Sequence, residues 1–247
     1  PDLPFFWYLE MLGALKKEFP QVHLKAFTAV EIDYLAKLAG LSLQETLIKL
    51  QNAGLGSLPG GGAEIFAPGV RNTLCAEKIS GDRWLEVMET AHGIGLKSNA
   101  TMLYGHIESY EDRVDHLLRL RDLQDRSNGF QAFIPLSFHA PNTEIVKSAY
   151  TTGFDDLKTL AISRLMLDNF DHIKAYWVML GAKVTQVSLS FGVDDIDGTV
   201  VEERITKMAG GTTDGSMTKN ELINLIRTAG KTPVERDTLY QTVKIWN

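Results

Sequence analysis

The stretch SNATMLYGHIESYEDR, residues 98–113, has the pattern of a strand, a turn and the start of a helix. Its first half is mostly apolar or β-tolerant up to Tyr104, and Gly105 then interrupts the run. The acidic and hydroxyl side chains at 108–112 are typical of a helix N-terminus. A strand that leads into a helix through a glycine turn is the repeating unit of an α/β fold, and its turn faces ligands above the sheet. The first candidate site residues are therefore Thr101, Gly105, His106 and Glu108.

The composition is that of a globular protein with room for one α/β domain. Of the 247 residues, 44% are hydrophobic and 23% are charged. The 25 basic and 31 acidic residues give a net charge of −6 without a Lys/Arg cluster, which argues against nucleic acid as a partner. No apolar run approaches the roughly 18 residues of a membrane span. The single cysteine, Cys75, excludes an internal disulfide and favours a reducing, cytoplasmic location.

Six predicted strands alternate with helices along the chain. We expect strands at about 22–27, within 54–66, and at 96–104, 130–136, 172–177 and 184–191. Because no hairpin signal separates them, they predict a parallel sheet with crossover helices. A closed (β/α) barrel needs eight such units, and the opening PDLP resembles the inside of a loop, so we expect an incomplete TIM-like barrel that lacks its first units. Residues 1–247 are expected to form one domain that ends in a helical tail from about 200 to 247.

A glycine-rich loop follows the second predicted strand. Gly60, Gly61 and Gly62 allow the backbone to approach a ligand and leave N–H groups available to it. The loop matches neither a Walker A nor a G-x-G-x-x-G pattern, so phosphate binding is not indicated. A sharp turn without a ligand is an equal alternative, but Glu64 directly after the loop is a natural acceptor for ribose hydroxyls or an amino group.

The other candidates follow later strands. His139 lies at the end of its strand, where barrel enzymes keep active groups, although a loop histidine bonded to local backbone is an alternative. Asp194, Asp195 and Asp197 resemble a Ca²⁺ or Mg²⁺ loop but lack the following glutamate that an EF-hand requires. Tyr176 could stack on an aromatic ligand, although aromatic residues at such positions are more often in the core.

Residues 101–108 resemble the G-x-I-x-G-x-x-E strand of radical S-adenosylmethionine (SAM) enzymes. Thr101 replaces the first glycine and Leu103 the isoleucine, while Gly105 and Glu108 match. Longer motifs over essentially the whole chain are similar to the aminofutalosine synthase family of the menaquinone pathway. They are AFTAVEI (26–32), GSLPGGGAEI (56–65), NATMLYGH (99–106), LQD (123–125), GF (129–130), FIPL (133–136), LDNF (167–170), HIKAYW (172–177) and DIDGT (195–199).

This resemblance implies a radical SAM barrel with a [4Fe–4S] cluster on a C-x3-C-x2-C loop and an external electron donor. In the family, the 5′-deoxyadenosyl radical from SAM adds to the small molecule 3-[(1-carboxyvinyl)oxy]benzoate, and aminodeoxyfutalosine forms with loss of a carboxylate. The cluster motif is absent here because Cys75 stands alone. We therefore expect the cluster ligands to lie outside this sequence and the chain alone to be inactive.

The resemblance also implies roles for the candidate residues, with no metal ligand among them. The expected SAM-binding residues are Gly60, Gly61, Gly62, Glu64, Thr101 and Leu103. The expected catalytic residues are His106, His139 and Asp194, and the expected substrate-binding residues are Arg71, Asn142, Tyr176 and Asp197.

Two alternatives remain at this point. The sister enzyme that forms cyclic dehypoxanthinylfutalosine shares the PGGGAEI loop (59–65), whereas residues 102–106 and 172–177 favour the synthase. The second alternative is a non-catalytic barrel that has no cluster and only binds small molecules.

Overall fold

A parallel sheet forms the centre of the protein in the computed structural model, which describes residues 3–139, 143, 145, 151–200, 208 and 216–247. The strand order is β1-β2-β3-β4-β5, with every neighbouring pair parallel. Lys25 adds one parallel bridge to Ser57 beside β1, so six parallel strand positions are present. The strands are β1 (Ser57–Leu58), β2 (Lys97–Tyr104), β3 (Phe130–Ser137), β4 (His172–Ala175) and β5 (Asp195–Ile196). The expected α/β class and the count of six units are confirmed.

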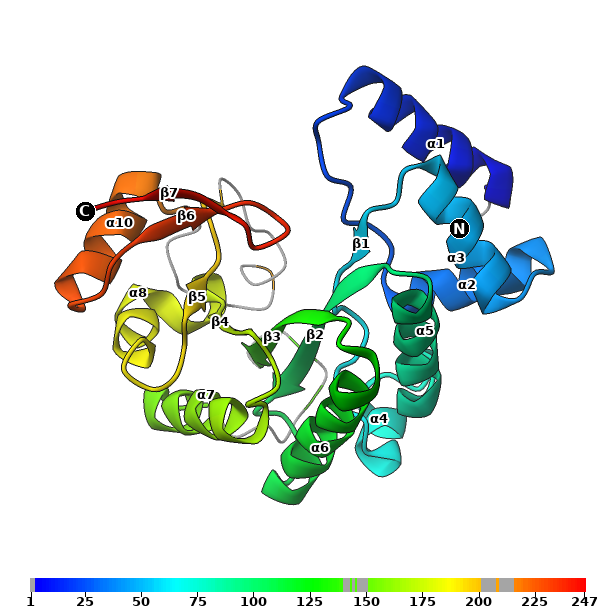
Figure 1. Cartoon of the computed structure of the whole chain (residues 1–247). Helices are drawn as coiled ribbons and strands as arrows, with labels where there is room; N and C mark the ends of the chain where they lie inside the picture. The colour runs from blue at the N-terminus through cyan, green and yellow to red at the C-terminus, as the bar shows by residue number, and fades with distance from the viewer. Residues whose placement is uncertain (1–2, 140–142, 144, 146–150, 201–207, 209–215) are drawn as a thin grey trace.

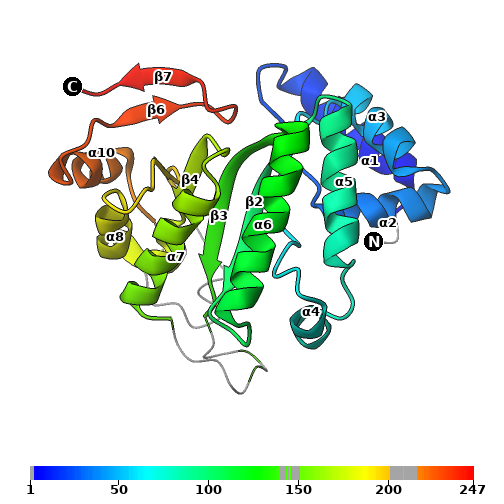
Figure 2. The same cartoon turned by 60° about the horizontal axis from the view of Figure 1, so that its bottom comes forward.

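Helices cover the outside of the curved sheet, so that the strands form part of a barrel (Figure 1). Helices α5 to α7 lie along the outer face of β2 to β4, and the view in Figure 2 shows α5 and α6 in front of β2. Before β1, α1, α2 and α3 pack on one another. The helices are α1 (Phe5–Glu18), α2 (Ala29–Ala39), α3 (Leu43–Ala53), α4 (Pro68–Leu74), α5 (Gly81–Gly93), α6 (Tyr110–Ser127), α7 (Gly153–Met166), α8 (Trp177–Ser188) and α10 (Lys219–Thr228).

The two faces of the sheet differ in their side chains because successive residues of a strand point to opposite sides. In β2, Ala100, Met102 and Tyr104 are fully buried under the helices. The alternate residues face the inside of the barrel, which we call the concave face. The register places the following residues on it: Asn99, Thr101, Leu103, Ala132, Ile134, Leu136, Lys174 and Asp195.

Side-chain caps determine where several helices begin. Thr28 and Glu31 form a capping box at α2, and Ser42 forms another with Glu45 at α3. Ser109 and its N3 partner Asp112 cap α6, which confirms the strand, turn and helix start expected over 98–113. The turns at the carboxyl ends of the first strands are therefore held by local hydrogen bonds.

Two sequence-based expectations about the last third of the chain are wrong. Residues 184–191 were expected as a strand, but most of them belong to α8, and the sixth strand position is the two-residue β5. Short apolar runs fit both periodicities, and the chain needs a crossover helix between the parallel strands β4 and β5. The tail contains the expected helix α10 but ends in an antiparallel hairpin of β6 (Val234–Arg236) and β7 (Thr242–Ile245).

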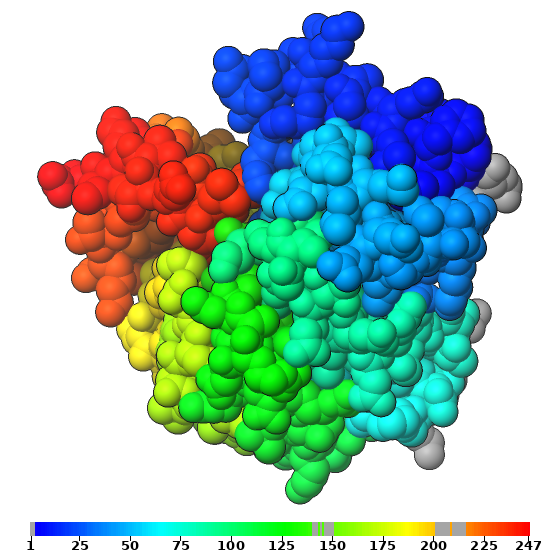
Figure 3. All heavy atoms as spheres, turned by 45° about the vertical axis from the view of Figure 1, so that its right-hand side comes forward, coloured from blue at the N-terminus to red at the C-terminus, as the bar shows by residue number. Residues whose placement is uncertain are grey.

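The hairpin lies at the amino ends of the parallel strands, opposite α4 (Figure 2). In the space-filling view the hairpin and the N-terminal helices both occupy the upper part of the molecule, above α5 and α6 (Figure 3). Tyr240, in the turn of the hairpin, stacks on His172 at the start of β4, with ring centres 4.5 Å apart. Among the described residues, no helix combines the length and the apolar character that a membrane crossing requires.

Candidate functional site

The carboxyl ends of the parallel strands bring most of the candidate residues to one end of the barrel. The segments that leave these ends are 60–64 after β1, 105–108 after β2, 138–139 after β3, Tyr176 after β4 and Asp197 after β5. In parallel α/β folds this end carries the ligand sites.

All carbonyl groups of the glycine loop, residues 60–65, accept hydrogen bonds from the protein. Thr101 Oγ1 donates to Gly60, Trp84 Nε1 to Gly61 and the backbone N–H of Leu103 to Glu64, at 2.6, 3.2 and 2.8 Å. The carbonyls of 62, 63 and 65 accept from Arg71. By contrast, the N–H groups of the three glycines have no acceptor among the described residues. The loop therefore holds its acceptors inward and keeps three donors available for a ligand.

The glycines also allow the loop to pack closely on its neighbours. A Cβ at Gly60 would lie 2.8 Å from the backbone of Ala100, and one at Gly62 would lie 2.6 Å from Val30. Gly62 in addition has a φ of +81°, which favours glycine. Glycine was expected here for approach to a ligand, whereas the structure shows close contact with the protein as a reason for glycine.

Arg71 supports this loop with a buried guanidinium group. It is 3% exposed and donates to the carbonyls of Gly62, Ala63, Ile65 and Ile79 at 2.5 to 3.2 Å. Burial lowers the pKa of Arg71, and no carboxylate forms an ion pair with it in the described structure. Because its donors are engaged by backbone, this geometry gives Arg71 a structural role instead of the expected contact with substrate.

Glu64 lies at the edge of a cavity of about 760 Å³ beside the glycine loop. Its carboxylate pairs with Lys78 Nζ at 2.7 Å, a residue that the sequence analysis did not select. Leu103 also lines the cavity, as expected, whereas the buried Thr101 bonds Gly60 and supports the loop from behind. The remaining lining residues are Thr73, Leu74, Cys75, Ile107, Phe138, Thr143 and Ile145.

His106 and Glu108 form a buried network in the turn after β2. The His106 ring donates through Nε2 to the carbonyl of Leu103 at 3.0 Å, and its Nδ1 lies 2.9 Å from Glu108 Oε2. Glu108 also accepts from the N–H of Gly105 at 2.6 Å and from Arg113 Nε at 2.8 Å. Burial alone would raise the pKa of Glu108, but the His106 and Gly105 hydrogen bonds and Arg113 lower it to about 2. This turn is thus rigid and carries a fixed negative charge.

His139 has an unused polar atom next to this turn. Its Nε2 is buried and has no hydrogen-bond partner among the described residues. A buried ring nitrogen without a partner is unfavourable unless a ligand or water supplies one. His139 therefore keeps its candidate role, while Asn142 lies outside the described residues.

The two aspartates near β5 lie at opposite ends of that strand. Asp194 precedes β5 and accepts from Arg164 Nη2, the N–H of Ile173 and the His172 ring at 2.6 to 2.8 Å. This is the amino end of the sheet, away from the glycine loop, so the geometry does not support the catalytic role expected for Asp194. Asp197 follows β5 at the carboxyl end, where Lys174 Nζ lies 3.1 Å from its carboxylate.

Tyr176 directly follows β4 and caps α8, at the expected end of the barrel. Its side chain is half-buried. Among the described residues, no group of three His, Cys, Asp or Glu side chains could hold a metal ion. The arrangement suits an organic ligand beside the glycine loop.

Two solved structures resemble this chain in fold. Methylornithine synthase aligns with a TM-score of 0.57 at 15% identity, covering 84% of this chain and 63% of that one. An FeFe-hydrogenase maturase from Carboxydothermus hydrogenoformans aligns with a TM-score of 0.61 at 14% identity, covering 94% of this chain and 54% of that one. At these identities the likeness establishes the fold.

Sequence relatives establish the family. Residues 127–247 match the family described as CofH/MqnC C-terminal region. The 5-amino-6-(D-ribitylamino)uracil–L-tyrosine 4-hydroxyphenyl transferase of Methanopyrus kandleri is 40% identical, over 100% of this chain and 68% of its own length. The aminodeoxyfutalosine synthase of Streptomyces coelicolor is 44% identical, over 99% of this chain and 66% of its length. That of Thermus thermophilus is 51% identical, over 100% of this chain and 68% of its length. The chain therefore belongs to the aminodeoxyfutalosine synthase family of radical SAM enzymes.

Proposed function

We propose that this protein forms aminodeoxyfutalosine from SAM and 3-[(1-carboxyvinyl)oxy]benzoate. The observation that carries the proposal is the glycine loop, whose carbonyls all accept hydrogen bonds from the protein and whose three glycine N–H groups have no acceptor among the described residues. Glu64 of the same loop lines a cavity of about 760 Å³. SAM bears a carboxylate, an ammonium group and ribose hydroxyls, which are the groups that such donors and the nearby Glu64 can bind. The 51% identity to the Thermus thermophilus aminodeoxyfutalosine synthase supports the same reading.

The residues of this chain fit SAM. The N–H groups of Gly60, Gly61 and Gly62 would donate hydrogen bonds to its carboxylate. Glu64, which pairs with Lys78, would accept hydrogen bonds from its ammonium group or ribose hydroxyls. Leu103 and Phe138 supply apolar surface in the same cavity. When bound, SAM supplies the 5′-deoxyadenosyl group that the reaction transfers.

The residues of this chain do not fit the [4Fe–4S] cluster. A cluster of this type needs three cysteine ligands here, and the sequence contains one cysteine, the buried Cys75. Burial raises the pKa of the Cys75 thiol, which disfavours the thiolate that metal binding requires. The cysteine ligands of the cluster would therefore have to come from outside this sequence.

The residues expected to contact or position the substrate include two histidines in the turns after β2 and β3. His139 Nε2 would bond a substrate oxygen, because it is buried and has no partner within the described residues. His106 would position the turn after β2, since both of its ring nitrogens are engaged. Tyr176 and Asp197 remain candidates for the benzoate ring and for hydroxyl groups, and Asn142 for a carboxylate.

The test uses the full-length polypeptide reconstituted with iron and sulfide. It is incubated with reductant and SAM, and with each of three substrate sets in separate reactions: 3-[(1-carboxyvinyl)oxy]benzoate, dehypoxanthine futalosine, or tyrosine with 5-amino-6-(D-ribitylamino)uracil. Release of aminodeoxyfutalosine supports the proposal. Turnover of either of the other sets, without aminodeoxyfutalosine formation, overturns it in favour of the sister cyclase or the tyrosine transferase.

A non-catalytic barrel would give a different result. It would bind SAM but cleave none of it under these conditions, even with the cluster present. A Gly61→Pro variant tests SAM binding by the loop. Proline has no backbone N–H, so the variant loses one of the three loop donors that have no acceptor among the described residues. SAM affinity measured by equilibrium dialysis should fall in this variant if the loop binds SAM.

A further inference from the structure

Three basic side chains meet at the concave face of the barrel, away from the glycine loop. Lys25 comes from the first strand position, Lys174 from β4, and Arg236 from β6 of the C-terminal hairpin. Lys25 bridges to Ser57, whose partner in β2 is Lys97, so strand alternation places Lys25 on the same face as Lys174. Segments more than 200 residues apart in sequence thus supply one basic cluster.

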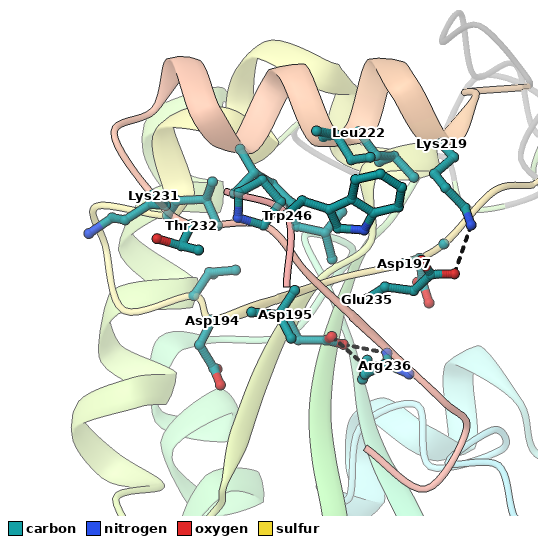
Figure 4. Close-up of a pocket in the computed structure, with 18 of the residues that line it drawn as sticks. Asp194, Asp195, Asp197, Lys219, Leu222, Lys231, Thr232, Glu235, Arg236 and Trp246 are labelled. Carbon is teal, nitrogen blue, oxygen red and sulfur yellow. Dashed lines mark hydrogen bonds and ion pairs between the residues drawn. The ribbon is translucent and has the colours of Figure 1, made fainter. Parts of the chain in front are cut away.

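Two of these cations are neutralised by carboxylates. Arg236 donates from Nε and Nη2 to the two oxygens of Asp195, at 2.7 Å each, and Figure 4 shows this pair. Lys174 Nζ lies 3.2 Å from Asp195 and 3.1 Å from Asp197. Burial disfavours the charged form of Lys174, but Asp197 and Asp195 outweigh it and raise its pKa to about 12. Both cations are therefore fixed as structural charges.

Lys25 is the cation that remains without a partner. It forms no ion pair or side-chain hydrogen bond with any described residue, although it is half-buried. The pKa of Lys25 is lowered to about 8, mainly by burial and also by the positive charges of Lys174 and Arg236. The carboxylates of Asp197 and Asp195 raise it, but by less. The cluster thus holds three cations and two carboxylates. Among the described residues, the positive charges of this cluster therefore exceed the negative ones by one, and a bound anion would balance them.

We propose that Lys25 binds the benzoate carboxylate of the substrate inside the barrel. This inference rests on the proposed synthase function, which gives the substrate two carboxylates. Lys25 lies three residues before Thr28, the N-cap of α2, and by strand alternation it faces the same interior as Leu103, which lines the cavity beside Glu64. A ligand held at that loop can therefore extend toward Lys25.

The chemistry of the two carboxylates decides which one Lys25 holds. The vinyl carboxylate is cleaved from the substrate during the reaction, and a cation bound to it would stabilise the ground state and slow its loss. The benzoate carboxylate keeps its charge throughout the reaction. A cation bound to it stabilises the ground state and the transition state equally and does not raise the activation barrier. Lys25 is therefore assigned to the benzoate carboxylate.

The test compares Lys25→Met with Lys25→Arg and with the surface control Lys17→Met in the reconstituted full-length enzyme. The substrates are 3-[(1-carboxyvinyl)oxy]benzoate and the analogue that lacks the ring carboxylate. We expect Lys25→Met to raise the substrate KM by at least ~30-fold, while the KM for SAM changes little. This is the size of effect that follows when one partner of a buried charge pair is removed. Lys25→Arg should restore part of the affinity, and Lys17→Met should match wild type.

The analogue separates a substrate contact from a structural role. Wild type should discriminate against it by a similar ~30-fold, and Lys25→Met should turn over both compounds equally. Thermal stability of Lys25→Met should equal or exceed that of wild type, because an unpaired, half-buried charge is removed. A substrate KM within ~3-fold of wild type, equal use of both compounds by wild type, or a destabilised Lys25→Met each overturns the assignment.

Failure of the synthase proposal gives a separate outcome. In that case wild type itself releases no aminodeoxyfutalosine. The inference about Lys25 fails on its own when wild type makes the product and Lys25→Met does so with the same substrate KM.

Discussion

Replacing Arg71 with methionine tests whether this residue holds the glycine loop or contacts substrate. Arg71 is 3% exposed, and its guanidinium donates four hydrogen bonds to the backbone carbonyls of Gly62, Ala63, Ile65 and Ile79. Methionine keeps much of the apolar volume of the side chain but offers no donor. The Arg71→Met substitution therefore leaves four carbonyl groups without their partner.

The size of the effect follows from those four groups. A buried acceptor left without a partner costs about 1 to 3 kcal/mol, and a loop near the surface recovers part of this from water. Taking about 1 kcal/mol for each carbonyl, we expect the free energy of unfolding to fall by about 4 kcal/mol. For a domain of this size such a loss lowers the melting temperature by about 10 °C.

The assay is chemical denaturation followed by circular dichroism, with SAM affinity measured on the folded protein. The control is Arg126→Met, because Arg126 pairs with Glu89 at the surface, where both side chains are about half exposed. This control should lose less than about 1 kcal/mol. SAM affinity should fall in Arg71→Met, because the loop donors lose their fixed positions.

A different pattern would refute this reasoning. If Arg71 binds a substrate carboxylate, Arg71→Met should unfold within about 1 kcal/mol of wild type. Its substrate KM should then rise while SAM binding stays unchanged. That result would return Arg71 to the role that the sequence analysis expected.

Four further predictions concern the turns and the ends of the strands. The pKa of Glu108 is about 2 in the folded protein and 4.5 in the unfolded chain. Its carboxylate therefore adds about 3 kcal/mol to the free energy of unfolding above pH 4.5, and this contribution is lost as the pH falls toward 2. Acid unfolding of Glu108→Gln should lack this component. Asp194→Asn should lower the free energy of unfolding by about 1 kcal/mol and leave kcat unchanged, whereas a large loss of kcat would restore its catalytic role. Gly60→Ala should cost about 1 to 3 kcal/mol in denaturation because its Cβ meets backbone, while Gly13→Ala, with nothing within 4 Å, should be neutral or stabilising. His139→Phe should reduce product formation by about 100-fold at an unchanged melting temperature, and normal turnover would remove it from the site.

Local patterns predicted the strand units and the position of the glycine loop. The run that ends at Tyr104, the break at Gly105 and the cap at Ser109 encode β2 and the start of α6 in neighbouring residues, and the structure confirms them. The capping box of Ser42 and Glu45 likewise depends on residues only three positions apart. Such features depend on contacts within a few positions of the chain, so one sequence contains the information that they need.

Local patterns failed where long-range contacts decide the structure. The segment 184–191 fits a strand by itself, and only the need to cross from β4 to β5 makes most of it helical. The hairpin at 234–245 and its Arg236 contact with Asp195 also depend on the assembled sheet.

The sequence alone therefore determined which residue types stand at the strand ends, including Gly60 and Glu64, since motif spacing is a property of the chain. Only the tertiary structure decided what those residues face. It turned the Arg71 guanidinium onto four carbonyls and left Lys25 without an ion pair in the described part of the chain. The physical reason is that hydrogen bonding and charge balance depend on distances between elements remote in sequence, which exist only in the folded protein.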